Sequence, residues 1–329
     1  MIGPILLCLL PGLLLIVTSN APAAEKLTTI YSARAMAQAL PWIAEEAGLF
    51  KNYNIDLKLV FIPSLSIVTA TLLGGDAEIT LTGGNANVIA YVRGSTDLAF
   101  VGGVKNVMTH SLVAGGSIKK PEDLRGKRIA VSQIGGASHY FTIQALRRFG
   151  MEPNRDYTFM VSGGDPEALA DLMSDNADAA PLNPPRDAKA LANGFHYVLY
   201  GPDLKIPMAI AFVTKRSVIA KRPQVIGDFM RAMAETAKIM HTDRDFVYQA
   251  LGKYLRVTER NILDSVYNTE IKALEPRLAI NLESLQATLD ELARTDARAK
   301  NIKPQELVDT RYLDEMNKSG FMDQLWSKK

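Results

Sequence analysis

The sequence predicts an α/β fold of two lobes, each built on a largely parallel sheet. Between Leu27 and Phe61, two apolar, β-rich runs flank a helix that ends at Ala47, and Gly48 follows where a left-handed C-terminal cap is expected. Strand, helix, strand within about 35 residues is the βαβ unit of a parallel sheet, whose strand-end loops receive ligands. A second series of this kind begins near Arg128.

The alternation of strands and short helices continues along the chain, which is typical of α/β architecture. In the first series we expect helices at Ser66–Leu73 and Asn85–Tyr91 and strands at Glu78–Thr82 and Leu98–Val104. In the second we expect a strand at Arg128–Ser132, a helix at Ser138–Phe149 and a strand at Tyr157–Val161. A β-like run at Ile206–Thr214 and a helix at Val225–Met240 follow, and the remaining chain reads as amphipathic helices.

A short internal sequence repeat supports two similar lobes. The segments Leu72–Thr80 and Leu172–Ala180 align, and in each a helix ends, turns and places an acidic residue before a strand. We expect crossovers at His110–Ala114 and Ala209–Thr214. The first lobe would then comprise residues 24–110 and 212–329, with the C-terminal helices, and the second lobe residues 111–211.

The N-terminus has the features of a signal peptide, residues 1–23. The apolar run Ile5–Val17 is too short to span a bilayer, which takes about 18 or more residues, and leads to the small-residue cleavage site Ala21-Pro22-Ala23. No Lys or Arg precedes the run, so an uncleaved anchor is the alternative. The single cysteine, Cys8, lies inside the run, and a thiol-free mature chain suits an oxidising periplasm.

The composition argues against several classes of function. The 37 Lys and Arg residues nearly balance the 35 Asp and Glu residues, so a nucleic-acid partner is not expected. The four histidines are scattered without metal-ligand spacing, and no nucleophile elbow, P-loop or dinucleotide fingerprint occurs. We therefore expect no catalytic residue, no metal and no cofactor.

The end of the opening helix and the residues just after it read Pro41-Trp42-Ile43-Ala44-Glu45-Glu46-Ala47-Gly48-Leu49-Phe50. This segment, the Pro121-Glu122-Asp123-Leu124-Arg125-Gly126-Lys127 turn and the Gly135-Gly136 turn resemble solute-binding receptors of ABC importers. The resemblance is to the nitrate/sulfonate/taurine branch, within a superfamily that includes thiamine-pyrimidine-precursor proteins. It implies a type II periplasmic-binding-protein fold, with two hinge crossovers and the solute between the lobes.

The strongest candidate for anion binding is the glycine turn before the helix expected at Ser138. Such a turn exposes the first N–H groups of the helix, at Gly136 and Ala137, beside the Ser138 hydroxyl. Backbone donors and the partial positive charge at a helix start favour an anion. The resemblance implies the same role for this turn. Alternatively, Ser138 is only the N-cap of the helix.

Other strand-end loops would face the same cleft. Ser32 and Arg34 offer a hydroxyl and a guanidinium that could bind a carboxylate or sulfonate. The remaining ligand-binding candidates are Ser64, Leu65, Gly84 and Asn85 in the first lobe and Asn183 in the second, with His139 and Trp42 as side walls. Caps and core packing are the alternatives for these residues, and Asp165 is expected as an N-cap rather than a ligand contact.

The sequence therefore favours an exported, monomeric solute-binding protein that captures a small anion, such as a sulfonate, nitrate or a carboxylate. Its expected macromolecular partner is the membrane permease of an ABC importer. Two other classes stay open at this point. One is an enzyme or receptor for a thiamine pyrimidine precursor, and the other is a sensing module for a membrane kinase.

Overall fold

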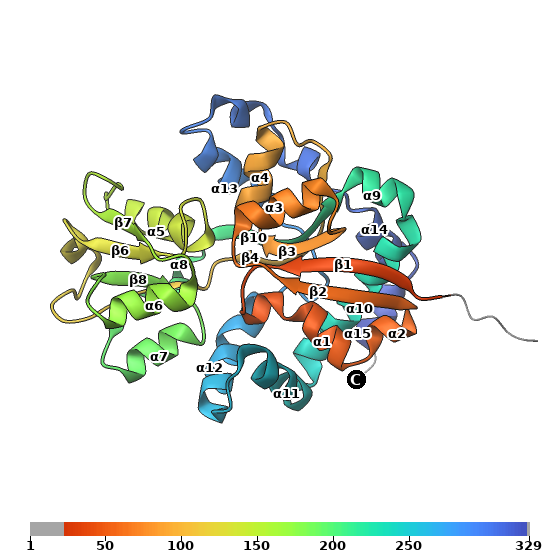
Figure 1. Ribbon diagram of the computed structural model, residues 1–329, viewed down its shortest axis with the longest axis horizontal. Helices are drawn as coiled ribbons and strands as arrows, with labels where there is room; N and C mark the ends of the chain where they lie inside the picture. Colours follow the sequence, from red (N-terminus) through yellow and green to blue (C-terminus); the bar gives the residue numbers. More distant parts are fainter. Residues whose placement is uncertain (1–22, 328–329) are drawn as a thin grey trace, which may run out of the picture.

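The computed structural model describes residues 23–327 and shows two lobes, each with a five-stranded sheet and flanking helices (Figure 1). The first sheet contains β1 (Glu25–Tyr31), β2 (Ile55–Phe61), β3 (Ile79–Gly83), β4 (Leu98–Val107) and β10 (Pro207–Lys215). The second contains β5 (Ser111–Ala114), β6 (Arg128–Val131), β7 (Thr158–Val161), β8 (Ala179–Leu182) and β9 (His196–Leu199). The predicted α/β class and the two-lobed fold are confirmed. The expected signal peptide, apart from Ala23, lies outside the described residues.

Helices cover both sheets. Beside the first sheet lie α1 (Leu40–Glu46), α2 (Leu49–Asn52), α3 (Leu65–Gly74), α4 (Asn85–Val92) and α9 (Arg216–Lys221). The C-terminal helices on the same lobe are α10 (Pro223–Thr242), α11 (Arg244–Leu255), α12 (Arg260–Glu270), α13 (Leu282–Leu292), α14 (Arg311–Lys318) and α15 (Phe321–Ser327). The second lobe has α5 (Ala137–Arg147), α6 (Asp165–Met173), α7 (Arg186–Ala192) and α8 (Gly201–Leu204). In residues 23–327, every helix is too short or too polar to traverse a bilayer.

Both sheets have the same pattern of strand directions. In the first, β1 is parallel to β2 and β3, and β10 runs antiparallel between β3 and β4. In the second, β6 is parallel to β7 and β8, and β5 runs antiparallel between β8 and β9. The antiparallel strand of each sheet is the one that the chain enters on arriving from the other lobe. The sheets are therefore largely parallel, as expected, apart from this one strand.

The crossovers lie elsewhere than the sequence suggested. The chain passes between the lobes at residues 108–110, after β4, and at residues 200–206, which include α8. The crossovers predicted near His110–Ala114 and Ala209–Thr214 are displaced: only His110 lies in the first observed crossover, Ser111–Ala114 is strand β5, and residues 209–214 lie inside β10. Both runs are buried throughout. A continuous apolar run of this length belongs to a strand that is covered on both faces.

The two lobes repeat one structural unit at an offset of 100 residues. Strands β1 and β6 end at Tyr31 and Val131, and strands β2 and β7 end at Phe61 and Val161. The pattern of buried and exposed positions over residues 61–84 is identical to that over residues 161–184. The repeat seen in nine residues of sequence thus extends to a whole strand–helix–strand unit. Equivalent strand ends should consequently present equivalent positions to the space between the lobes.

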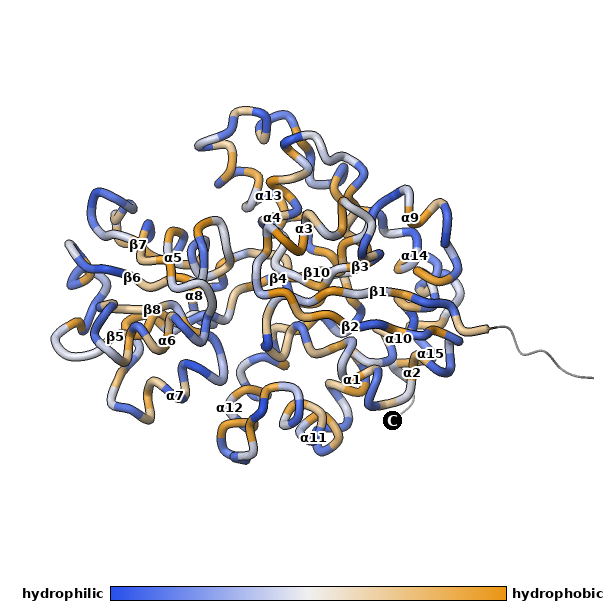
Figure 2. Tube along the Cα trace, in the orientation of Figure 1, coloured by the Kyte–Doolittle hydropathy of each residue, from blue (hydrophilic) through white to orange (hydrophobic). Residues whose placement is uncertain are grey.

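The core of the first lobe depends on close packing of its C-terminal segment against β4. Figure 2 shows the central strands as hydrophobic and the outer turns as hydrophilic. Gly102 and Gly103 in β4 leave room for residues 278–280, and the Gly103 N–H donates to the Leu278 carbonyl at 2.7 Å. A side chain at Gly103 would collide with the backbone of Ala279. This packing holds the end of β4, where the first crossover begins.

Candidate functional site

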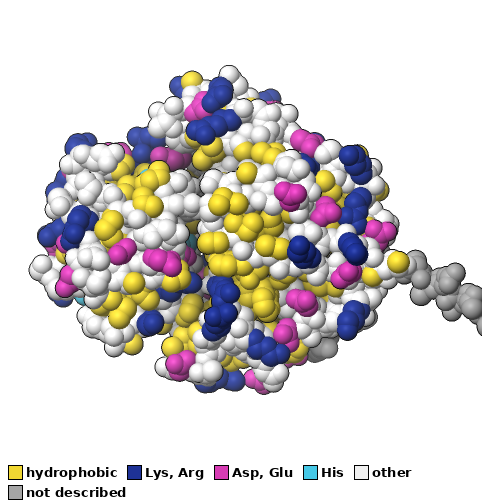
Figure 3. All heavy atoms as spheres, viewed as in Figure 1, with side chains coloured by type: hydrophobic (Ala, Val, Ile, Leu, Met, Phe, Trp, Pro, Cys, Tyr) yellow, Lys and Arg dark blue, Asp and Glu magenta, His cyan; other side chains and the backbone are white. Residues whose placement is uncertain are grey.

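A cavity of about 350 Å³ lies between the two lobes. Strand-end loops of both lobes line it, which is where open α/β sheets bind ligands. On the face seen in Figure 3, hydrophobic side chains gather on the first lobe beside its boundary with the second. The apolar part of the lining comes mainly from Phe61, Pro63, Leu65, Met108, Met208 and Ile210. The cavity thus combines apolar walls with polar groups at the strand ends.

Two serines occupy equivalent positions in this lining. Ser32 follows β1, and its N–H donates to Gln38 Oε1 at 2.7 Å. Ser132 follows β6, and its N–H donates to Ser138 Oγ at 3.0 Å. In each lobe the side chain six residues further on therefore holds the strand-end serine. The Ser32 hydroxyl also lies 2.8 Å from Thr82 Oγ1, at the end of the neighbouring strand β3.

One arginine from each lobe also lines the cavity. The Arg34 guanidinium lies over the Phe61 ring, 5.3 Å from its centroid. Arg186 is the first residue of α7, and its Nη1 donates to Asn183 Oδ1 at 3.4 Å. Neither guanidinium forms an ion pair with any carboxylate of residues 23–327. Two guanidinium groups without carboxylate partners can bind an acid group placed between the lobes.

Five of the predicted ligand-binding residues line the cavity: Ser32, Arg34, Leu65, Ala137 and Asn183. The other seven lie outside its lining: Trp42, Ser64, Gly84, Asn85, Gly136, Ser138 and His139. Several immediate neighbours of these seven do contribute, namely Pro63, Gly83 and Ala137. Most of the loops expected at the cleft therefore line the cavity, whereas seven of the residues expected within them do not.

Ser138 has a different role from either one expected. Gly136 is the N-cap of α5, and Ser138 is neither that cap nor a lining residue. The Ser138 side chain is 2% exposed, and its hydroxyl turns back to Ser132, with the two Oγ atoms 2.9 Å apart. It accepts the Ser132 N–H as well. Ser138 thus holds the strand end in place, and Ser132 carries the polar surface into the cavity.

The two predicted side walls pack against other aromatic rings. The Trp42 ring lies 5.2 Å from that of Tyr254, between α1 and α11. The His139 ring lies 4.4 Å from that of Phe159 in β7, and burial lowers the pKa of its imidazole. Trp42 and His139 thus pack against neighbouring rings, which is the alternative role that the sequence analysis gave for them.

The remaining predicted residues serve local structure. The Gly84 N–H donates to the Ala209 carbonyl at 2.8 Å, which ties the start of α4 to β10. Asn85 Oδ1 accepts from Thr288 Oγ1 of α13 at 3.5 Å. Ser64 is the N-cap of α3, and its hydroxyl lies 3.0 Å from that of Ser66 at the helix start.

The prediction that Asp165 is only a helix N-cap is wrong, and this correction matters most for the site. Gly164, not Asp165, is the N-cap of α6, and the half-buried Asp165 side chain lines the cavity. Burial raises the pKa of the carboxyl, whereas Arg186 and a hydrogen bond from Ser132 act to lower it. No ion pair joins Asp165 to another side chain of residues 23–327. The cavity therefore presents one carboxylate along with the two arginines.

A buried polar network lies behind the cavity at the first crossover. Lys105 in β4, which lines the cavity, donates from Nζ to Glu270 Oε2 and to Thr109 Oγ1, both at 2.8 Å. The Thr109 hydroxyl also donates to Glu270. Next along the chain, His110 lines the cavity, and burial, followed by the charge of Lys105, lowers its pKa to about 3. The network joins the crossover to the end of α12.

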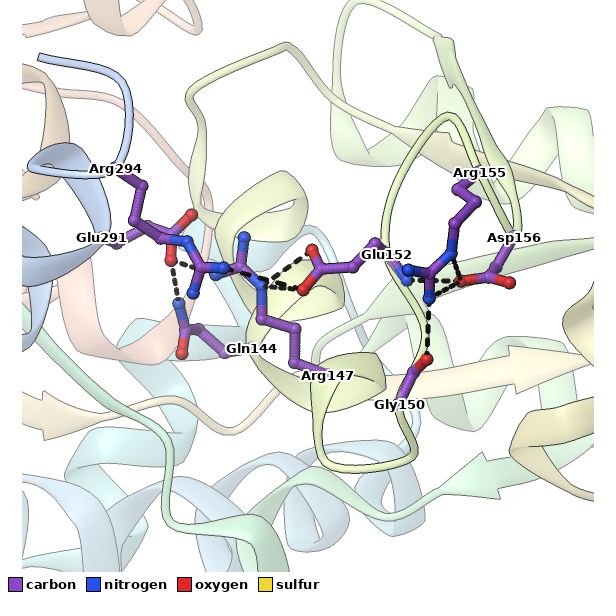
Figure 4. A network of polar contacts seen from close by, with 8 residues as sticks. All are labelled: Gln144, Arg147, Gly150, Glu152, Arg155, Asp156, Glu291 and Arg294. Carbon is purple, nitrogen blue, oxygen red and sulfur yellow. Dashed lines mark hydrogen bonds and ion pairs between the residues drawn. The ribbon is translucent and has the colours of Figure 1, made fainter.

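Outside the cavity, a second network bridges the lobes (Figure 4). Arg147 of α5 donates to Glu291 of α13, and Gln144 Nε2 donates to the same Glu291 carboxylate at 2.9 Å. Arg147 also donates to Glu152 at 3.0 and 3.1 Å, and Arg294 lies 3.7 Å from Glu152. These contacts link a helix of the second lobe to a helix packed on the first.

The described residues form no cluster of three or more His, Cys, Asp or Glu side chains that could hold a metal ion. The profile of the NMT1/THI5-like family matches residues 39–245, which is more than half of the chain. The chain belongs to the NMT1/THI5-like family. The match runs through both lobes and both crossovers, and it includes the loops that line the cavity except the one after β1, residues 32–38.

Two curated relatives with similar sequences are named as periplasmic binding proteins. The chain is 28% identical over 203 residues to the taurine-binding periplasmic protein of Escherichia coli. The aligned segment covers 60% of this chain and 59% of the relative. A relative from Brachyspira hyodysenteriae, named for a periplasmic binding role in an ABC transporter, is 26% identical over 222 residues, or 62% of each chain. The match thus spans less than two thirds of either relative.

Solved structures of low sequence identity share the fold. The aliphatic sulphonate binding protein SsuA of Escherichia coli has a TM-score of 0.70 at 20% identity, covering 86% of this chain and 97% of that one. The nitrate-binding protein NrtA of Synechocystis PCC 6803 has a TM-score of 0.73 at 15% identity, covering 91% and 90%. The desulfurization enzyme DSZB also matches, with a TM-score of 0.68 at 14% identity, covering 90% and 99%. The fold of the family thus occurs in binding proteins and in an enzyme.

Sequence reasoning missed five charged or titratable lining residues: Lys105, His110, Asp165 as a cavity residue, Glu167 and Arg186. Arg186 has the clearest signal in retrospect. It follows Asn183-Pro184-Pro185, in the loop after a strand that the family resemblance placed at the cleft. A basic residue at the first helical position lies at the positive end of the helix dipole, where it is unfavourable. Such a residue in a cleft loop is a candidate anion ligand.

Proposed function

We propose that this protein is the exported solute receptor of an ABC importer and binds a small organic acid between its lobes. The observation that carries this proposal is the pair Arg34 and Arg186, which face one cavity from opposite lobes without ion-pair partners in residues 23–327. An acid group between them would draw the lobes together by charge-assisted hydrogen bonds. Closure around the solute about the two crossovers would then bury it.

The size and walls of the cavity favour an organic solute over nitrate. The cavity has a volume of about 350 Å³, many times the ~10–15 Å³ that one water molecule needs on the same measure. An inorganic anion would leave most of this space to water and would not contact Phe61, Met108 or Met208. An alkyl sulfonate or carboxylate would cover these apolar walls with its carbon chain and gain free energy from the burial.

The relatives support the transport role. The Escherichia coli relative is named for taurine binding and the periplasm, and SsuA is titled for aliphatic sulphonate binding. We propose by extension that the lobes divide at the two observed crossovers, so that residues 24–107 and the chain from residue 207 onward form one lobe and residues 111–199 form the other. The partner would be a membrane permease, and the receptor would act as a monomer that makes and breaks no bond.

Export is proposed from the apolar run and the Ala21-Pro22-Ala23 site. Strand β1 begins at Glu25, so cleavage after Ala23 would remove no strand or helix of residues 23–327. Mass spectrometry of protein from the periplasm should find Ala24 as its first residue. A full-length species retained in the inner membrane would contradict this part of the proposal.

The binding function is tested by calorimetric titration after a thermal-shift screen of alkanesulfonates, carboxylates, nitrate and thiamine pyrimidines. Arg34→Met and Arg186→Met should each weaken binding of the organic acid about tenfold to a hundredfold, as a hydrogen bond to a charged group contributes ~1.5–3 kcal/mol. Arg148→Met is the matched control, because Arg148 is exposed at the end of α5 and away from the cavity.

Two results would overturn the proposal. One is that no sulfonate or carboxylate binds, or that the two cavity arginines can be replaced without loss of affinity. The other is recovery of a chemically altered solute after the complex is denatured, which would move the protein to the enzyme class. Preferential binding of a thiamine pyrimidine would favour that substrate instead.

A further inference from the structure

The equivalent positions Leu65 and Asp165 both line the cavity and differ in chemistry. They are the first residues of α3 and α6, the helices that follow β2 and β7. The repeat of the fold therefore places an apolar side chain at one helix start and a carboxylate at the other. This difference gives the second-lobe end of the cavity a negative charge that the first-lobe end lacks.

A purely structural role does not account for Asp165. An acidic residue in the first turn of a helix is favourable through the helix dipole, but that effect needs no burial. Glu167, in the same turn, already folds its carboxylate back over Gly164 at the helix start. Asp165 is instead half-buried in the cavity wall and has no ion-pair partner within residues 23–327. Burial raises the pKa of its carboxyl more than the charge of Arg186 and the hydrogen bond from Ser132 lower it, so a further positive partner in the cavity would stabilise the carboxylate.

The charges around the cavity balance rather than accumulate. The charge of Lys105 is neutralised by Glu270 at 2.8 Å, so the free cationic groups of the lining are Arg34 and Arg186. Asp165 opposes them from the same lobe as Arg186, and the exposed Glu167 stands at the rim. A solute with only a negative group would engage Arg186 and so weaken its support of the half-buried Asp165, which would keep only the hydrogen bond from Ser132, and this costs free energy. A second, positive group on the solute removes that cost.

We propose that the solute is a small organic zwitterion. Its acid group binds Arg34 and Arg186, and its ammonium group donates to the Asp165 carboxylate. A short carbon spacer lies against the apolar walls. This inference rests on the proposed function and narrows it to amino-sulfonates or amino-carboxylates. Asp165 is then the residue that distinguishes such solutes from simple alkyl acids.

Matched pairs of probes that differ by one amino group test the inference directly. The pairs are 2-aminoethanesulfonate with ethanesulfonate, and 3-aminopropanoate with propanoate, titrated by calorimetry into the full mature chain. At least one amino compound should bind about tenfold to a hundredfold more tightly than its partner, the effect of a hydrogen bond between charged groups. In Asp165→Asn the two members of that pair should bind with similar affinity.

The control variant is Asp171→Asn, on the same helix but outside the cavity lining, and it should keep the wild-type preference. Thermal melting without solute confirms that each variant is folded. If Asp165→Asn does not fold, the preference of the wild-type protein alone decides whether the solute is a zwitterion.

The outcomes separate this inference from the proposed function. If the alkyl acids bind as tightly as the amino compounds or more tightly, the proposal of a zwitterionic solute is wrong. The proposal of a receptor for an organic acid is not affected by that result. An amino preference that survives in Asp165→Asn, or is lost only in Glu167→Gln, shows that Asp165 is the wrong residue. If none of the four probes binds and the wider screen also fails, both proposals are wrong.

Discussion

Ser32 and Ser132 occupy the same place in the two lobes, each directly after the first strand of the repeated unit and each lining the cavity. Both N–H groups are held by the side chain six residues on, which is Gln38 in one lobe and Ser138 in the other. The repeat therefore builds two similar strand ends that face each other. Specificity must come from positions where the repeats differ, and Leu65 and Asp165 are such a pair.

This relationship predicts different effects for the two serines of the second lobe. Ser138→Ala removes the acceptor of the Ser132 N–H, so the free energy of unfolding should fall by about 1–3 kcal/mol. Ser132→Ala removes a cavity hydroxyl, so affinity should fall about twofold to tenfold, since one neutral hydrogen bond contributes ~0.5–1.5 kcal/mol. Denaturant unfolding and calorimetric titration measure the two quantities.

Ser174→Ala is the control for both serines. Its hydroxyl donates to the Ala170 carbonyl on an exposed part of the same lobe, at 2.9 Å. The prediction is wrong if Ser138→Ala keeps wild-type stability and loses affinity tenfold. In that case the Ser138 hydroxyl would contact the solute directly, as the sequence first suggested.

The buried pair of Lys105 and Glu270 predicts a large loss of stability when one partner is removed. Their side chains are only 4% and 3% exposed. Glu270→Gln leaves a buried ammonium without its carboxylate, and the free energy of unfolding should fall by roughly 3–5 kcal/mol. The double variant Lys105→Met/Glu270→Gln should recover much of the loss, because no buried charge then remains.

The exposed pair of Lys253 and Glu46, at 2.7 Å, provides the comparison. Glu46→Gln should change the free energy of unfolding by less than about 1 kcal/mol. Chemical denaturation of the four proteins checks both statements. Similar losses for Glu270→Gln and Glu46→Gln would show that solvent reaches the crossover network.

His110 predicts a pH dependence of stability with a definite sign. Burial lowers the pKa of its imidazole to about 3 in the folded protein, whereas a histidine in an unfolded chain titrates near ~6.5. Below pH ~6.5 the imidazole takes up a proton in the unfolded chain but not in the folded protein. As the pH is lowered through this range, the free energy of unfolding therefore decreases by at most ~1.4 kcal/mol per pH unit. Above that pH the contribution is constant.

The difference between wild type and His110→Gln isolates this effect from other titrating groups. The stability curve of the variant should be flatter between pH 4 and 6.5, as measured by urea unfolding at each pH. Titration of the imidazole by NMR provides a second reading. A His110 pKa near the ordinary value, or parallel curves for the two proteins, would contradict the prediction.

Most strands and helices followed from sequence because they have a local physical signal, whereas strand β5 was expected as a crossover. Gly48 and Gly75 have positive φ and stand where helices were expected to end, since glycine adopts that conformation without strain. The βαβ order and the Ser66–Leu73 helix also came from local periodicity. These signals need only the neighbouring residues, and so they survive without knowledge of the tertiary fold.

The cavity lining depends on contacts that no local pattern encodes. Whether Ser132 or Ser138 faces the solute is decided by how the start of α5 meets the end of β6, a matter of one helical turn. Lys105 follows the strand expected at Leu98–Val104, and nothing near it in sequence marks it, because its partner Glu270 is 165 positions away. The loops could therefore be predicted from their place after strands, but the side chains that reach the cavity could not.

The network in Figure 4 predicts how the lobes are held together. Arg147 and Glu291 join α5 of the second lobe to α13 on the first, outside the cavity, and their side chains are 20% and 22% exposed. If closure about the crossovers retains the solute, this pair stabilises the closed arrangement. Partly exposed pairs contribute up to ~1 kcal/mol, so Glu291→Gln should weaken solute binding about twofold to fivefold. The loss should appear as faster dissociation in stopped-flow measurements.

Glu315→Gln is the matched control for closure. Glu315 pairs with Arg231 between α14 and α10, entirely within the first lobe, so its loss cannot change the relation between the lobes. Small-angle X-ray scattering without solute should show a larger radius of gyration for Glu291→Gln than for Glu315→Gln or wild type. Because the pair lies outside the cavity, unchanged scattering together with weaker binding would point to local damage in α13. Unchanged scattering and unchanged dissociation would show that the lobes close without help from this contact.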